Sequence, residues 1–341
     1  MDGDPILPGM GVPTLASPAL PSPARAIAAA AHGVVPVVVA GAGERASRRF
    51  LEFFAATIRN PNTRAAYHRA VVRFFAWCET HGIGELVMIE PLHVAAYVEQ
   101  LGREFEKPTV KQHLAAVRML FDWLAAGGVL AANPAAPVRG PKHVVKRGRT
   151  PVLTPDEARQ LLDSIDIATV VGLRDRALVA LMTYTFARVG AAVAMQVEDY
   201  YPEGKRWWVR LHEKGGKQHA MPAHHNLEAW LDAYLQRAGI VGERKSPLFR
   251  TTRGRTGILT AAGMTRVDAW RMIRRRARAA GLDVAVCCHT FRATGITAYL
   301  GNGGTLENAQ LMAAHESPRT TKLYDRTRDE ITLDEVERIA I

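Results

Sequence analysis

Apolar residues recur with helical spacing in two long stretches of the first half of the chain. In "NPNTRAAYHRAVVRFFAWCETHG" they follow the order i, i+4, i+7 and i+11, at Tyr67, Val71, Phe74 and Cys78. In "KPTVKQHLAAVRMLFDWLAAGG" a similar stripe occurs, at Val110, Leu114, Val117, Phe121 and Leu124. Such a stripe is typical of a helix that packs against other helices. With two further helices expected near residues 43–59 and 91–105, the pattern predicts a four-helix domain over residues 43–131.

The second half of the chain predicts another domain, over residues 152–341. It opens with "TPDEARQLLDSI", where Thr154 can cap a helix, Pro155 suits its first turn and Glu157 completes a capping box. Helical patterns continue until "KRWWVRLHEKGGKQHAMPA", where apolar and polar residues alternate and two glycines can form a turn. Alternation around a glycine turn predicts a β-hairpin. The expected fold class is therefore mainly α with a small antiparallel β-sheet, in two domains.

Two stretches outside these domains lack a sustained apolar period. Residues 1–42 are rich in Ala, Pro, Gly and Val, which indicates a mostly disordered arm. Residues 132–151 contain several prolines, which indicates a linker. No acidic residue occurs between Asp122 and Asp156, whereas this linker is basic. A basic run is usually a solvated segment, but between two domains it also suits a chain that contacts a phosphate backbone.

Composition and charge narrow the class of protein. The chain has 341 residues, of which 48% are hydrophobic and 23% charged, as in soluble globular proteins. A net charge of +11 favours a polyanionic partner, nucleic acid ahead of a membrane surface. Three cysteines, two of them adjacent, give no disulfide framework, so we expect a reducing, cytoplasmic setting. The run "AIAAAAHGVVPVVVAG" is too short and interrupted to span a bilayer, and the acidic N-terminus is unlike a signal peptide.

Several residues could carry chemistry, although each also has an ordinary structural explanation. His289 and Arg292 in "CCHTFRATG" are spaced i, i+3, so on a helix they can meet one anion, but surface pairs share this spacing. Arg188 follows an apolar run expected to form a buried helix, where a simple salt bridge would also explain it. Lys214 lies at the expected hairpin turn, a common place for a solubilising lysine.

A histidine and a tyrosine near the C-terminus form another candidate pair. In "AAHESPRTTKLYDR", Ser317 and Pro318 are placed to start a new helix, so His315 is expected at a corner between two helices. Tyr324 is then expected two turns into the new helix. Neither residue identifies a site by itself.

The order of these candidates resembles the phage integrase family, the tyrosine recombinases. Members have an arginine after a buried helix, a lysine in a hairpin turn, an HxxR box, a further histidine or tryptophan and finally a tyrosine. The corresponding residues here are Arg188, Lys214, His289, Arg292, His315 and Tyr324. The steps of 23 residues from Arg292 to His315 and of nine from His315 to Tyr324 resemble those of compact bacterial, Xer-like members. Residues 43–131 are similar to the family's helical core-binding, SAM-like domain.

The resemblance implies a site-specific DNA recombinase that cleaves and rejoins DNA through a 3′-phosphotyrosine intermediate, with no metal, ATP or other cofactor. Tyr324 would be the nucleophile. Arg188, Arg292 and His315 would bind the scissile phosphate, whose nonbridging oxygens gain negative charge during the reaction. Lys214 would protonate the leaving 5′ oxygen, and His289 would assist.

The resemblance also implies how the chain meets double-stranded DNA. The two domains would form a clamp, with a dimer on inverted half-sites and a tetramer in synapsis. A C-terminal segment, here Leu333 to Ile341, would pack into the neighbouring subunit, although such a short amphipathic segment more commonly caps its own domain. Phosphate contacts are expected from the linker and from the arginine-rich helix in "TRVDAWRMIRRRARAAG", at Arg147, Arg149, Arg271, Arg274 and Arg275. Affinity should then fall steeply with salt concentration.

The chain departs from the family pattern at three places. Ala191 stands where a glutamate is common, three residues after the first arginine. Ala313 and Ala314 stand where Leu-Gly is common before the histidine. Gln218 and His219 replace a Glu-Arg ending after the hairpin lysines. These are supporting positions, so we expect an active enzyme.

Two other functions would explain much of the same sequence evidence. A DNA-binding relic without catalysis would have the same charge and domains, and a type IB topoisomerase-like enzyme would nick and close DNA without strand exchange. A zinc site is disfavoured because the histidines and cysteines lack CxxC or HxxxH spacing. If Tyr324 is not the nucleophile, Tyr299 is the next candidate.

Overall fold

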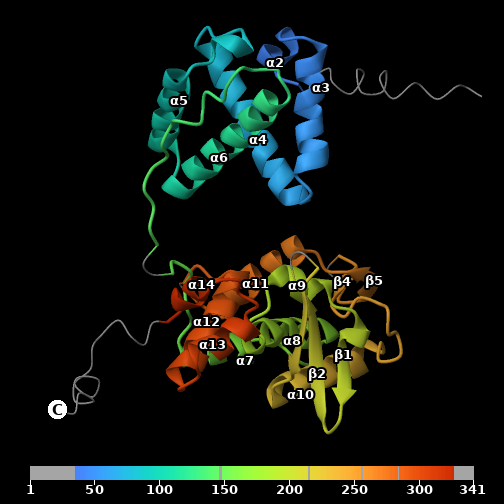
Figure 1. Ribbon diagram of the computed structural model, residues 1–341. Helices are drawn as coiled ribbons and strands as arrows, with labels where there is room; N and C mark the ends of the chain where they lie inside the picture. The colour runs from blue at the N-terminus through green and yellow to red at the C-terminus, as the bar shows by residue number, and fades with distance from the viewer. Residues whose placement is uncertain (1–34, 146–147, 214–215, 255, 283, 326–341) are drawn as a thin grey trace, which may run out of the picture. The chain divides into compact units, whose positions relative to one another are not determined.

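The computed structural model divides the chain into two compact units, Met1–Val144 and Val145–Ile341 (Figure 1). It describes residues 35–145, 148–213, 216–254, 256–282 and 284–325. Both units are mainly helical, each has its own hydrophobic core, and the second also contains small antiparallel sheets. The expected fold class is confirmed. Among the helices of the described ranges, none is long and apolar enough to cross a membrane.

The first unit is built from helices that bury the predicted apolar stripes. Its helices are α2 (Val37–Gly41), α3 (Glu44–Glu52), α4 (Pro61–Thr80), α5 (Pro91–Glu104) and α6 (Lys107–Ala126), with a π-helical turn over Phe53–Thr57 and a 3₁₀ turn over Leu86–Met88. Asn60 caps α4 by accepting from the N–H groups of Asn62 and Thr63. Phe74 of α4 meets Phe121 of α6 edge to face, with 5.8 Å between ring centroids. The four predicted helices are confirmed.

The prediction that residues 1–42 form a mostly disordered arm is wrong for the end of that range. Val37–Gly41 form α2, and Val38 and Val39 are buried in the core of the first unit. A five-residue helix is too short to show a period in the sequence, but it is ordered here because it covers an apolar face. Residues 1–34 lie outside the described residues.

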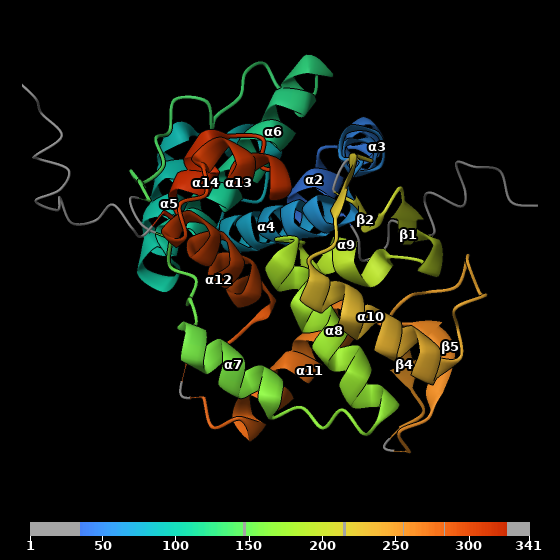
Figure 2. The same ribbon diagram turned by 90° about the horizontal axis from the view of Figure 1, so that it is seen from below.

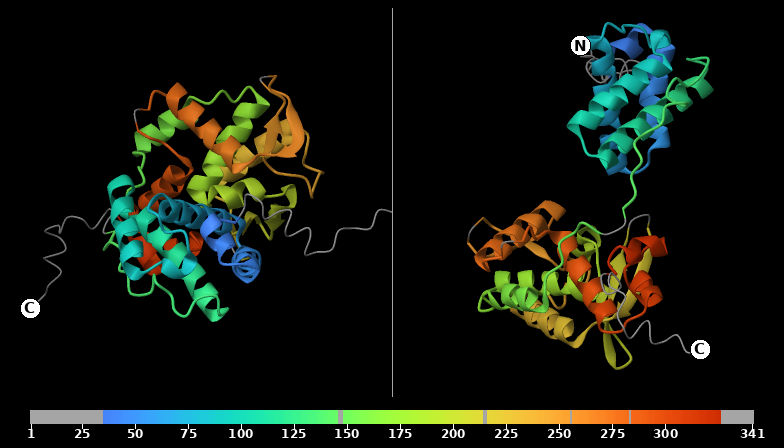
Figure 3. Two further views of the ribbon diagram at one scale, coloured as in Figure 1. Left: turned by 90° about the horizontal axis from the view of Figure 1, so that it is seen from above. Right: turned by 90° about the vertical axis from the view of Figure 1, so that its left-hand side faces the viewer.

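The second unit has α8 at its centre. Its helices are α7 (Pro155–Asp163), α8 (Val170–Tyr184), α9 (Val189–Ala194), α10 (His225–Ala238), α11 (Arg266–Ala279), α12 (Cys288–Gly301), α13 (Leu306–Met312) and α14 (Pro318–Lys322), with a 3₁₀ turn over Val197–Asp199. α8 packs against both α10 and α12 (Figure 2), and α13, coloured red, leads from α12 into α14 (Figure 3). Gly295 permits the close approach of α12 to α8, because an added Cβ would lie 2.0 Å from the carbonyl oxygen of Thr183. The predicted capping box of Thr154 and Glu157 is present at the start of α7.

The second unit also contains two small sheets. The first has three antiparallel strands, β1 (Tyr200–Glu203), β2 (Arg206–His212) and β3 (Gln218–Pro222). Val209 of β2 pairs with Met221 of β3, and Val209 and Leu211 are buried, as the alternation predicts. The predicted hairpin is therefore confirmed. The pattern does not predict the second sheet, whose strands are too short to show clear alternation: β4 (Arg250–Thr252) and β5 (Leu259–Gly263).

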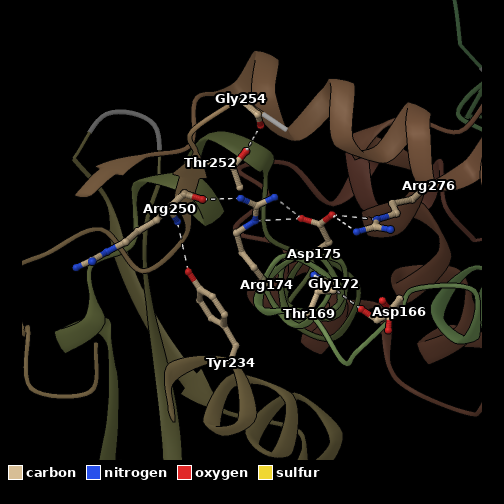
Figure 4. A network of polar contacts seen from close by, with 10 residues as sticks. All are labelled: Asp166, Thr169, Gly172, Arg174, Asp175, Tyr234, Arg250, Thr252, Gly254 and Arg276. Atoms are coloured by element: carbon tan, nitrogen blue, oxygen red, sulfur yellow. Dashed lines mark hydrogen bonds and ion pairs between the residues drawn. The ribbon is translucent and has the colours of Figure 1, made fainter. Parts of the chain in front are cut away.

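A network of buried charges joins α8 to α11 and β4 (Figure 4). Asp175 accepts hydrogen bonds from Arg174 at 2.6 and 3.0 Å and from Arg276 at 2.8 and 2.9 Å. Arg174 also donates to the backbone carbonyl of Arg250 at 2.7 Å. Because Arg174 and Asp175 are buried, each charge depends on these partners. The network fixes the position of α11 against α8.

Candidate active site

Arg292 is the most deeply buried of the predicted site residues that the structure describes. It lies on α12 with 1% of its surface exposed. Its guanidinium donates to the backbone carbonyls of Phe186 and Ala313, the latter at 2.5 Å. Phe186 follows α8 and Ala313 ends α13, so this side chain joins three segments. Burial, and then the charge of Arg188, lowers the pKa of Arg292 to about 10, which leaves it protonated at neutral pH.

Two residues in the left-handed conformation shape the backbone around this guanidinium. Phe186 has a φ of +54° and Ala314 a φ of +46°. The conformation costs an L side chain roughly 1–2 kcal/mol, whereas glycine adopts it freely. Ala314 is the position where the family pattern has glycine. The bonds from Arg292 to the carbonyls of Phe186 and Ala313 stabilise the backbone at both places.

His315 follows this corner and is fixed by its neighbours. Its N–H donates to the carbonyl of Gln310 at 3.1 Å, and its own carbonyl accepts from the Gln310 amide at 3.1 Å. Its ring Nδ1 lies 2.9 Å from the hydroxyl of Thr321 on α14. Burial, followed by the charges of Arg292 and Arg188, lowers the pKa of His315 to about 3. The ring is therefore neutral at physiological pH.

Tyr324 lies two residues beyond the end of α14, not two turns into that helix as predicted, because α14 is short. Its ring is nearly parallel to that of His315, with 5.8 Å between centroids and 8° between planes. Its carbonyl accepts from the hydroxyl of Thr297 on α12 at 3.1 Å. Its phenol raises the pKa of Arg292 and so partly offsets the effect of burial. The ring packs against a cluster formed by Phe186, Ile296, Ala309 and Ala313.

Arg188 occupies the N-cap position of α9 and contacts the β2–β3 hairpin. Its Nη1 lies 2.7 Å from Oε2 of Glu213, the residue after β2. On the same hairpin, Lys217 forms an exposed ion pair of 3.0 Å with Glu316 of the corner before α14. The hairpin is thus tied to two segments of the site. Lys214, the predicted general acid, lies outside the described residues.

His289 is exposed on α12, three residues before Arg292. Partial burial of its ring, and then the charges of Arg292 and Arg188, lowers its pKa. The same two arginines act on His315. The structure therefore brings Arg188, His289, Arg292 and His315 close enough for their charges to interact, and Tyr324 interacts with Arg292 of this group.

Buried histidine rings give a pH dependence of stability that can be measured. Burial is the first cause of a lowered pKa at five histidines: His113, His219, His224, His289 and His315. As the pH falls through about 6.5, the unfolded chain takes up protons that the folded chain does not bind, so the free energy of unfolding decreases. We expect the thermal unfolding midpoint to fall between pH 7 and pH 5, and less steeply in His315→Gln. A midpoint that is constant over this range would contradict the assignment.

Comparison with protein families identifies the chain. The model of the phage integrase family matches residues 151–330, and the model of the phage integrase N-terminal SAM-like domain matches residues 48–128. The chain belongs to the phage integrase family. As a member of the phage integrase family, it is a tyrosine-type site-specific recombinase, an enzyme that breaks and rejoins DNA, as the sequence predicts.

Sequence relatives and solved structures of similar fold are recombinases and integrases, in agreement with this family. The tyrosine recombinase XerD of Corynebacterium glutamicum is 31% identical over 276 residues, covering 77% of this chain and 86% of that protein. XerD of Vibrio cholerae is 29% identical over 274 residues, covering 79% and 87%. A post-cleavage complex of XerH with a palindromic difH substrate has a TM-score of 0.66 at 17% identity, covering 93% and 94% of the two chains. A lambda integrase dimer on a COC′ core site has a TM-score of 0.65 at 21% identity, covering 84% and 79%. These structures share the fold of this integrase-family chain.

The arginines predicted to contact DNA are exposed where the structure describes them. Arg149 is exposed before α7, and Arg147 lies outside the described residues. Three are exposed on α11: Arg271, Arg274 and Arg275. Arg276 of the same helix differs, because its guanidinium is committed to the buried network with α8. It is a structural residue of this recombinase.

Sequence reasoning misses the residues that hold the site together. Gln310 and Thr321 position His315, but nothing in their sequence context sets them apart from other polar residues. Glu213 pairs with Arg188 and has a partial signal, since it is the carboxylate beside the hairpin lysine in "HEKGGKQ". The sequence does not show which arginine that carboxylate meets.

Proposed function

We propose that Tyr324 is the nucleophile of the recombination reaction and that Arg188, Arg292 and His315 bind the scissile phosphate. The observation that carries this proposal is the stacking of Tyr324 on neutral His315 beside the buried Arg292. If the Thr321 hydroxyl donates to Nδ1 of His315, the proton of the neutral ring is on Nε2, where it can be donated to a phosphate oxygen.

The proposed reaction balances with the residues of this chain. The phenol of Tyr324 gives its proton to the neutral imidazole of His289, and its oxygen bonds to phosphorus while the bond to the 5′ oxygen breaks, which leaves a 3′-phosphotyrosine. Negative charge grows on the nonbridging oxygens, and fixed guanidinium and imidazole donors stabilise it. The leaving 5′ oxygen takes a proton from Lys214, assisted by His289. Attack by a 5′ hydroxyl reverses these steps, so rejoining needs neither ATP nor a metal.

The proposed partner is double-stranded DNA with inverted half-sites. Similar structures include a lambda integrase dimer on a core site and a lambda integrase tetramer on a Holliday junction, which supports a dimer on one site and a tetramer in synapsis for this chain. Phosphate contacts are proposed for Arg147, Arg149, Arg271, Arg274 and Arg275. The segment Leu333 to Ile341 lies outside the described residues, and its packing into a neighbouring subunit stays a prediction. Three unpaired cysteines support a cytoplasmic setting.

The proposal is tested by trapping the covalent intermediate. A nicked duplex that carries the repeats flanking this gene releases a short strand after cleavage, so the intermediate cannot be rejoined. We expect a denaturation-resistant adduct, and mass spectrometry of its digest should place the DNA on Tyr324. An adduct at Tyr299 would overturn the nucleophile assignment. Bound DNA without any adduct would indicate a non-catalytic relic, and relaxation of supercoiled DNA without strand exchange would indicate a nicking and closing enzyme.

A further inference from the structure

The ion pair between Arg188 and Glu213 joins the start of α9 to the β2–β3 hairpin, 25 positions further along the chain. Nη1 of Arg188, the N-cap residue of α9, lies 2.7 Å from Oε2 of Glu213, which follows β2. The side chain of Glu213 is 3% exposed and that of Arg188 is 37% exposed. The carboxylate therefore lies on the inner side of the pair, and part of the guanidinium faces solvent.

The helix that follows Arg188 supplies no carboxylate of its own. α9 has the sequence VGAAVA, without an ionisable side chain, and Ala191 one turn into it is buried. Among the described residues, Glu213 is the carboxylate that forms a salt bridge with Arg188. The orientation of this guanidinium thus depends on a residue from the hairpin.

Stability alone does not account for a buried carboxylate at this place. Within the described part of the chain, Oε1 of Glu213 is buried without a hydrogen-bond partner. His219 lies within the electrostatic reach of Glu213, Arg188 and Arg292. A buried charge whose polar atoms are only partly paired lowers stability relative to an apolar residue. Such groups cluster at functional sites, where they fix the geometry of another group.

We propose that Glu213 is a positioning residue that fixes the guanidinium of Arg188 for the scissile phosphate. The carboxylate holds Nη1 from the buried side, so the remaining donors of Arg188 stay available to an anion on the exposed side. It takes the place of a carboxylate on α9, which this chain lacks at Ala191. This inference rests on the proposed function, because it assigns Arg188 to the phosphate.

The test measures adduct formation and DNA affinity separately. Glu213→Gln keeps the shape of the side chain but removes its charge, so at saturating protein we expect the rate of adduct formation to fall by about 10- to 100-fold. The apparent Kd in a gel shift should change by less than about twofold, because exposed arginines elsewhere supply most of the affinity. Glu203→Gln, at an exposed carboxylate of β1, is the matched control and should keep the wild-type rate.

A double-mutant cycle separates positioning from a general structural role. In an Arg188→Ala background, Glu213→Gln should change the rate by less than about twofold, because the group it positions is gone. Glu213→Asp keeps the charge on a shorter side chain and should give an intermediate rate, which keeps the test valid if Glu213→Gln unfolds. A wild-type rate in Glu213→Gln, or an undiminished effect in the Arg188→Ala background, would overturn the inference. Failure of the wild-type chain to form any adduct would instead contradict the proposed function.

Discussion

Replacing Tyr324 with phenylalanine is expected to abolish the covalent protein–DNA adduct completely. The change removes the oxygen that attacks phosphorus, and no other group in the proposed reaction can take its place. Phenylalanine keeps the ring that stacks on His315 and packs against Phe186. The free energy of unfolding should therefore change by no more than about 1 kcal/mol, the usual contribution of one hydrogen bond. Denaturing gels measure the adduct, and gel shifts on the same duplex measure binding, which should match the wild type.

Tyr299→Phe is the matched control for this experiment. Tyr299 lies on α12 in the same apolar cluster and meets Phe186 edge to face, with 6.0 Å between ring centroids. It is also the alternative nucleophile that the sequence suggests. We expect Tyr299→Phe to form the adduct at the wild-type rate. The opposite pattern, an inactive Tyr299→Phe and an active Tyr324→Phe, would transfer the nucleophile role to Tyr299.

The features of the fold that the sequence predicts are those with a long local period or an ordered set of reactive residues. α4 and α6 each have 20 residues, so their apolar stripes repeat over several turns and are visible without any tertiary information. The hairpin is predictable because a glycine turn interrupts an alternating pattern. The family is predictable because its chemistry requires particular residue types, and its shared fold keeps them in one order along the chain.

The contacts that assemble the site could not be predicted, because they are long-range. Arg292 reaches the carbonyl of Phe186, 106 positions away in the chain. Phe186 has a left-handed backbone conformation, which only glycine makes predictable from sequence. Asp175 and Arg276 are 101 positions apart, and nothing distinguishes Arg276 from the exposed arginines of α11 until its partner is known. Local sequence patterns predict burial and turns, whereas the residues that form a hydrogen bond or an ion pair depend on how distant segments pack together.

Arg292→Ala is expected to lower both catalysis and stability, which distinguishes it from Tyr324→Phe. The rate of adduct formation should fall on the order of 10³-fold, since a fixed donor to the developing charge is lost. The carbonyls of Phe186 and Ala313 would also lose a buried partner, at a cost of about 1–3 kcal/mol for each carbonyl left unpaired. Denaturant unfolding of the full chain measures the second effect independently of DNA.

Arg292→Lys separates the two roles of this side chain. The ammonium keeps the positive charge near the phosphate but lacks the planar fork that donates to two carbonyls, so part of the adduct rate should return while most of the stability loss persists. Arg206→Ala, at an exposed arginine of β2, should leave both quantities close to wild type. If Arg292→Ala is inactive but unfolds at the wild-type denaturant concentration, the two carbonyl bonds contribute nothing to the fold. The role of Arg292 would then be confined to the phosphate, and the strain at Phe186 and Ala314 would need another source of stabilisation.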